Sequence, residues 1–166
     1  MLLAFYWGLA LSQYQPRFEP TPPSVVQAMT DLAAVKAGDV VFDLGCGDGR
    51  LVIAAARLGA RATCVDIDPR RIAEARDNAR QAGVEQRIAF RTENLFDTDL
   101  AGASVVMLFL SPDYNLKLRE RLRRLRPGTR IVSHWHGMGD WRPQKKVDVQ
   151  VDSRSHAVYL WVIPGG

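Results

Sequence analysis

The sequence predicts an α/β fold of the doubly wound type, in which helices cover both faces of a mostly parallel sheet. From residue 21 onward, short apolar segments alternate with amphipathic segments that have the 3.6-residue period of helices. The short segments are apolar along most of their length, which is typical of parallel strands buried on both faces. The last two strand segments have no helix between them. We therefore expect them to form an antiparallel hairpin at one edge of the sheet.

Each element has a local signal in the sequence. Pro22 and Pro23 after Thr21 indicate the start of the first helix, because a proline in the first helical turn loses no hydrogen bond. Asp68 before Pro69 is typical of a helix cap, and glycines follow the helical segments. The predicted helices are 21–38, 51–58, 68–83 and 115–125, and the predicted strands are 40–42, 62–65, 88–90, 104–110, 129–133, 147–151 and 157–163.

Length and composition indicate one globular domain. The chain has 166 residues, 47% of them hydrophobic and 24% charged, which excludes a disordered, collagenous or multi-pass membrane protein. Two cysteines make no disulfide scaffold, so we expect a reducing compartment and a cytoplasmic location.

The first eleven residues are apolar and contain no lysine or arginine. They are too few to span a bilayer, which takes about 20 residues. Two alternatives stay open: a helix that packs on the domain, or a shallow membrane contact through Phe5, Tyr6 and Trp7. We therefore divide the chain into a hydrophobic segment with its linker, residues 1–17, and a folded domain, residues 18–166.

A glycine-rich loop, DLGCGDG at residues 43–49, follows the first strand and opens a helix. Glycines at this place let the backbone approach a ligand closely. Arg50 stands where a dinucleotide-binding loop has its third glycine, and Asp43 and Asp48 would repel a pyrophosphate. A ligand with an amino group and a sulfonium fits the two acids better. S-adenosylmethionine is such a ligand.

Further residues complete this predicted site. Asp66 ends the second strand and would accept hydrogen bonds from both ribose hydroxyls. Ile67 would cover one face of the adenine, and the Asn94 side-chain oxygen would accept a hydrogen bond from the adenine amino group. The cofactor-binding residues that we expect are Asp43, Gly45, Cys46, Gly47, Asp66, Ile67, Asn94 and Leu95.

The three motifs DLGCGDG, VDIDP at 65–69 and ENLF at 93–96 have the order and spacing of class I S-adenosylmethionine-dependent methyltransferases. This resemblance covers about residues 18–166 and implies a Rossmann-like sheet of seven strands, S-adenosylmethionine as cofactor and methyl transfer as the activity. Many members of the family have an aspartate where this chain has Asn94.

A narrower resemblance lies in PTPPSVV at 20–26, DLGCGDGRLVIAAA at 43–56 and PGTRIVSHWHGMGDW at 127–141. These stretches resemble the short protein-lysine N-methyltransferases related to the ATP synthase c-subunit lysine methyltransferase. The resemblance implies N-methylation of lysine in a protein substrate.

The acceptor end of the site is expected after the fourth strand. Related enzymes often carry an Asn/Asp-Pro-Pro-aromatic tetrad there, from which residues 111–114 depart at the first and third positions. Asp113 and Tyr114 are candidates for orienting the acceptor, and a helix cap is the alternative for Asp113. Further candidates for the substrate cleft are Ser111, His134 and His136, without a metal, since zinc would need two more ligands. Residues 1–24 and the loops after 110 and 133 would roof the cleft.

Positive charge is concentrated at the C-terminal end of the chain. Residues 117–166 hold 11 basic and 4 acidic side chains, whereas residues 1–116 hold 11 basic and 14 acidic ones. The basic run 117–126 is either a solvated helix face, with Glu120 paired to Arg124, or a contact for RNA. Methylation of RNA or of a small molecule, and a non-catalytic module that binds S-adenosylmethionine, are therefore the alternatives to lysine methylation.

Overall fold

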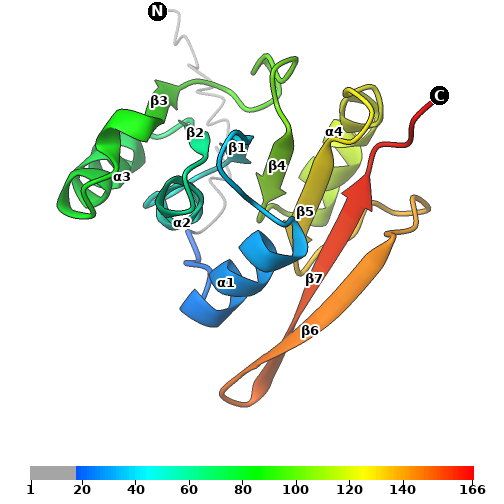
Figure 1. Ribbon diagram of the computed structural model, residues 1–166. Coiled ribbons are helices and arrows are strands. Elements are labelled where there is room, and N and C mark those ends of the chain that lie inside the picture. Colours follow the sequence, from blue (N-terminus) through cyan, green and yellow to red (C-terminus); the bar gives the residue numbers. More distant parts are fainter. Residues whose placement is uncertain (1–17) are drawn as a thin grey trace, which may run out of the picture.

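A computed structural model describes residues 18–166, which form a three-layered α/β domain (Figure 1). The expectations for residues 1–11 lie outside the described residues. The strands are β1 (Val40–Leu44), β2 (Arg61–Asp66), β3 (Ile88–Thr92), β4 (Val105–Leu108), β5 (Arg130–His134), β6 (Lys145–Val151) and β7 (Arg154–Val162). The helices are α1 (Pro23–Leu32), α2 (Arg50–Arg57), α3 (Pro69–Gln81) and α4 (Pro112–Arg123), and a short 3-10 helix, η1 (Glu85–Arg87), precedes β3.

The strands form one sheet in the order β3-β2-β1-β4-β5-β7-β6. The first five are parallel to one another, and β7 lies antiparallel between β5 and β6. This arrangement confirms the predicted doubly wound sheet of seven strands with an antiparallel hairpin at one edge. The strand order reverses between β1 and β4, which is where such folds bind ligands, beyond the carboxyl ends of the strands.

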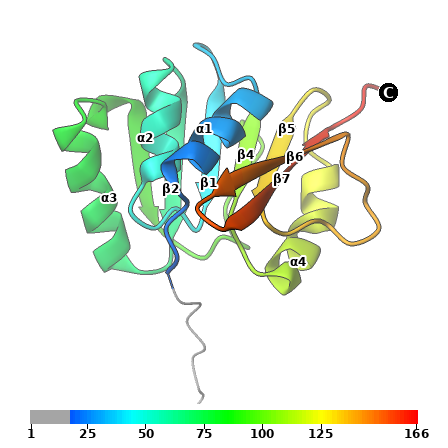
Figure 2. The same ribbon diagram turned by 90° about the horizontal axis from the view of Figure 1, so that it is seen from below.

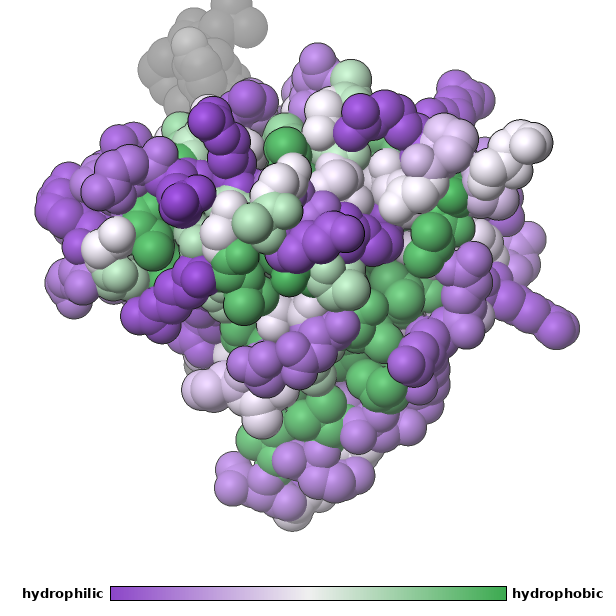
Figure 3. Space-filling model, in the orientation of Figure 1, coloured by the Kyte–Doolittle hydropathy of each residue, from purple (hydrophilic) through white to green (hydrophobic). Residues whose placement is uncertain are grey.

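Helices cover both faces of the sheet, as Figure 2 shows. On one face, α1, α2 and α3 enclose a core that includes Met29, Val52 and Ala75. On the other face, Leu118 and Leu122 of α4 pack on strand residues such as Leu108. Figure 3 shows hydrophobic side chains near α1 and the β6–β7 hairpin, where the alternate valines of β6 pack against the first core.

Two local expectations need correction, and a third is confirmed. The first helix ends at Leu32 and not at Gly38, because the guanidinium of Arg130 donates to the carbonyls of Ala33 and Ala34, and Ala34 has φ +48°. Glu120 pairs with Arg119 and Arg123 and not with Arg124. The predicted cap of α3 is confirmed, since the Arg70 N–H donates to Asp68 Oδ1 at 2.9 Å.

The two cysteines are joined in a disulfide, which corrects the expectation of reduced thiols. The glycine loop folds back onto β2, where the Cys46 N–H donates to the carbonyl oxygen of Val65. This contact brings the Cα atoms of Cys46 and Cys64 to 5.3 Å, within the range that a disulfide bridges. Within residues 18–166, no helix is long and apolar enough to cross a membrane.

Candidate active site

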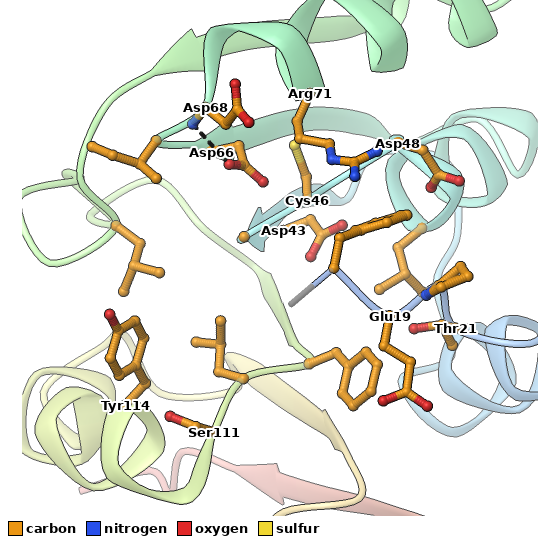
Figure 4. A pocket seen from close by; sticks show the side chains of 18 of the residues that line it. Glu19, Thr21, Asp43, Cys46, Asp48, Asp66, Asp68, Arg71, Ser111 and Tyr114 are labelled. Carbon is orange, nitrogen blue, oxygen red and sulfur yellow. Dashed lines mark hydrogen bonds between the residues drawn. The ribbon is translucent and has the colours of Figure 1, made fainter. Parts of the chain in front are cut away.

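A cavity of about 570 Å³ lies at the carboxyl ends of β1, β2 and β4 (Figure 4). Five parts of the chain supply its walls: the segment before α1, the glycine loop, the starts of α2 and α3, the turn after β3, and the segment after β4. The lining includes Phe18, Glu19, Thr21, Asp43, Gly45, Cys46, Asp48, Arg50, Asp66, Ile67, Arg70, Arg71, Asn94, Leu95, Phe109, Leu110, Ser111 and Tyr114, with His136 from the turn after β5.

The glycine loop presents its backbone to this cavity. Its glycines Gly45, Gly47 and Gly49 have φ of +83°, +54° and +82°, which side chains rarely adopt. Gly47 also lies directly under the ring of Phe18, so that a Cβ there would come within 2.3 Å of the ring. The loop therefore needs glycine for its conformation and, at Gly47, for space.

Two backbone N–H groups hold the carboxylate of Asp66 at the end of β2. The Gly47 N–H donates to Oδ2 and the Asp68 N–H donates to Oδ1, both at 3.0 Å. Since a carboxylate oxygen accepts more than one hydrogen bond, both oxygens can still accept another. The pair of acceptors suits two neighbouring hydroxyl groups, as in a ribose.

Asp43 at the end of β1 is buried, with 2% of its surface exposed. Burial, together with the nearby carboxylates of Asp66 and Asp48, raises the pKa of Asp43 to about 8. A cation placed next to this side chain would stabilise its ionised form. Asp48 is different, because although burial acts to raise its pKa, hydrogen bonds from Arg50 lower it below the ordinary value.

The predicted adenine-binding residues Ile67, Asn94 and Leu95 all line the cavity. Ile67 is 63% exposed, which is unusual for isoleucine and leaves its side chain free to cover a ligand. The oxygen of the Asn94 side chain accepts a hydrogen bond from the Phe96 N–H at 3.0 Å. Asn94 thus fixes the turn after β3 with the atom that we expected to meet the adenine.

The predicted acceptor-end residues divide into two groups. Ser111, Tyr114 and His136 line the cavity, and burial lowers the pKa of His136. Asp113 is exposed in the first turn of α4, outside the cavity lining.

His134 also lies outside the lining. It is fully buried, and its Nε2 is 2.9 Å from Nδ1 of His156. Burial, and then the neighbouring histidines, lower the pKa of His134 to about 4, so that it is neutral at pH 7.

Sequence reasoning missed several cavity residues. Residues 18–21 line the cavity and belong to the segment 1–24 that we expected to roof the cleft, but no motif indicated Phe18 or Glu19. The guanidinium of Arg71 lies 3.9 Å from the centre of the Phe18 ring. An aromatic and an acidic residue next to a Pro-rich helix start are the signal that could have identified this segment.

This sheet order, with a glycine loop after β1 and an acid at the end of β2 facing one cavity, defines a class I S-adenosylmethionine-dependent methyltransferase. The chain belongs to the family described as the ANTKMT methyltransferase domain, which residues 43–145 match.

Its similarity to individual proteins extends over most of the chain. It is 40% identical over 149 residues to a protein-lysine N-methyltransferase of Saccharolobus islandicus, covering 88% of this chain and 92% of the relative. It is 32% identical over 156 residues to the mouse adenine nucleotide translocase lysine N-methyltransferase, covering 85% of this chain and 66% of the relative. The crystal structure of an RNA methyltransferase from Salinibacter ruber in complex with S-adenosyl-L-homocysteine is similar with a TM-score of 0.83 and 46% identity, covering 89% of this chain and 95% of that one.

Proposed function

We propose that this enzyme transfers the methyl group of S-adenosylmethionine to the side-chain nitrogen of lysine in a protein. One observation about the cavity carries this proposal beyond its similarity to lysine methyltransferases. The lining residues after β4 and β5 are apolar, hydroxyl-bearing or imidazole side chains, and the three lining arginines belong to the starts of α2 and α3. The acceptor end therefore suits a cation, because within residues 18–166 it presents no arginine or lysine that could bind a phosphate.

Within this proposal, the donor binds along the glycine loop. Asp66 accepts hydrogen bonds from the ribose hydroxyls, while Ile67 and Leu95 enclose the adenine. Asp43 lies next to the amino group, and the backbone of residues 45–47, including Cys46, approaches the methionine part. These roles are supported by the position of each residue in one cavity and by the preorganised hydrogen bonds of Asp66.

Bound S-adenosylmethionine supplies a methyl carbon that its sulfonium already activates. The protein has to bring a neutral lysine amine in line with that carbon, and lysine has an ordinary pKa of about 10.4. Ser111 and Tyr114 can orient the amine through their hydroxyl groups. The imidazole of His136 lines the same cavity and can accept the proton that the amine loses.

RNA is the second candidate substrate, because the 46% identical structure is described as an RNA methyltransferase. The basic run of α4 is only partly available to RNA. Arg121 donates to the carbonyls of Phe96 and Thr98, and Arg119 pairs with Asp140. These arginines hold loops onto the domain, which weakens the case for RNA.

Transfer of a radiolabelled methyl group to denatured cell protein and to RNA from the same cells separates the candidates. We expect label in protein, recovered as methyllysine after acid hydrolysis, and its loss in the Asp66→Ala variant. Label in RNA alone would contradict the proposal. Binding of S-adenosylmethionine without transfer to either acceptor would identify a non-catalytic module.

A further inference from the structure

We propose that the carboxylate of Glu19 binds the ammonium group of the acceptor lysine and places it for methyl transfer. This inference rests on the proposed lysine acceptor and adds a residue that the motifs of the sequence did not indicate. Glu19 precedes α1 and lines the same cavity as the glycine loop. Figure 4 shows its side chain beside Thr21, across the cavity from Ser111 and Tyr114.

The charges that line the cavity leave Glu19 available for a cation. Each arginine of the lining is already engaged with an acid: Arg50 with Asp48, Arg70 with Asp68, and Arg71 with Glu74. Among the described residues, neither a hydrogen bond nor an ion pair engages the carboxylate of Glu19.

Three carboxylates of the lining, Asp43, Asp66 and Glu19, have no basic partner among the described residues. Backbone N–H groups hold Asp66, whose proposed partner is the ribose. Asp43 and Glu19 remain for the two cations that the reaction brings. Asp43 lies at the end of β1 beside the glycine loop, where the donor's amino group is expected. Glu19 lies on the other wall, in the segment that leads into α1. The second cation is the ammonium of the acceptor lysine.

The cavity that Glu19 lines also suits the rest of the acceptor side chain. Phe109 and Leu110 add apolar wall for the methylene groups of lysine, and His136 belongs to the same lining. The lysine nitrogen gives one proton to the imidazole of His136, and its lone pair then forms the bond to the methyl carbon. The carbon–sulfur bond breaks toward sulfur, leaving S-adenosylhomocysteine and a methylammonium group that Glu19 can hold.

The test compares Glu19→Gln, which removes the charge and keeps the shape, with Glu19→Asp and the wild-type chain. Denatured cell protein is the acceptor, methyllysine is counted, and calorimetry gives the affinity for S-adenosylmethionine. We expect Glu19→Gln to raise the apparent KM for protein lysine about tenfold or more, because a charged hydrogen bond is lost. Donor affinity should change by less than about twofold, and Glu19→Asp should restore part of the KM. Glu120→Gln, on the exposed side of α4, is the matched control.

Each outcome separates the inference from the proposed function. No methyllysine from the wild-type chain would overturn the proposed function, and this inference with it. Methyllysine from the wild type with an unchanged KM in Glu19→Gln would overturn the inference alone. So would a loss of donor affinity in that variant, because Glu19 would then bind the donor instead of the acceptor.

Discussion

The buried carboxyl of Asp43 should link donor binding to pH, if it contacts the amino group of the donor as proposed. Its pKa of about 8 means that it is mostly protonated at pH 7 in the free protein. An ammonium group at its side favours the ionised form, so that binding of S-adenosylmethionine should release close to one proton. We expect affinity to rise between pH 6 and pH 8 by up to about tenfold per pH unit. Calorimetry in buffers of different ionisation enthalpy measures this release, and Asp43→Asn should abolish it. Equal heats in all buffers would contradict the argument.

The same side chain should cost stability when no donor is bound. Because the folded-state pKa is raised from 3.8 to about 8, the stability present at pH 4 is lost as the pH rises toward 8. Asp43→Asn removes this dependence. Its melting temperature should therefore exceed that of the wild type by several degrees, about 5 °C or more, at pH 8 and approach it at pH 4 to 5. Thermal unfolding monitored by circular dichroism tests this, and a difference that does not change with pH would contradict it.

At the scale of elements, the disulfide ties the glycine loop to β2. Cys46 and Cys64 are separated by 18 residues, and closing a loop of that length stabilises a fold by about 3 kcal/mol. Reduction should then lower the melting temperature by roughly 5–10 °C. It should also weaken donor binding, because Cys46 belongs to the loop that lines the cavity. Calorimetry with and without a phosphine reductant measures both effects. A chain with Cys46→Ala and Cys64→Ala is the control and should not respond to the reductant.

Elements with strong local signals were predictable from the sequence. The parallel strands follow from short apolar segments, and α3 follows from its cap at Asp68. Helix ends that depend on distant groups were not. The end of α1 is set by Arg130, almost a hundred residues away, whose guanidinium also pairs with Asp39. No pattern near residue 33 carries that information.

The residues of the site also differ in how far the sequence predicts them. Residues that belong to a local motif, such as Asp43 and Asp66, line the cavity as expected. Residues brought there by the chain path, such as Phe18 and Arg71, have no motif, and their contact exists only in three dimensions. His134, which we expected in the substrate cleft, does not line the cavity. Its place after a strand suggested the cleft, but β7 brings His156 beside it and buries both side chains.

At the scale of the whole molecule, which has a net charge of +4, the basic side chains differ in whether they bind other parts of the fold. Some basic side chains of α4 hold the fold together, as Arg121 does through the carbonyls of Phe96 and Thr98. Others, such as Arg124 and Arg126, are exposed and have no ion pair with another described residue. Net charge alone therefore does not identify a nucleic-acid surface.

Two variants distinguish the arginines that stabilise the fold from those that are exposed and have no ion pair within residues 18–166. Arg124→Gln with Arg126→Gln should leave the melting temperature and lysine methylation unchanged, and it should reduce the salt dependence of RNA binding by a slope of about 1.4, since two counterion-releasing contacts are lost. Arg121→Gln should instead lower stability by about 1–3 kcal/mol, because two partly buried carbonyls lose their donor. Denaturant unfolding and RNA titrations at several salt concentrations measure the two effects. Loss of methyl transfer to protein in the double variant would mean that the basic face takes part in acceptor binding, and the acceptor would then have to reach from α4 to the cavity.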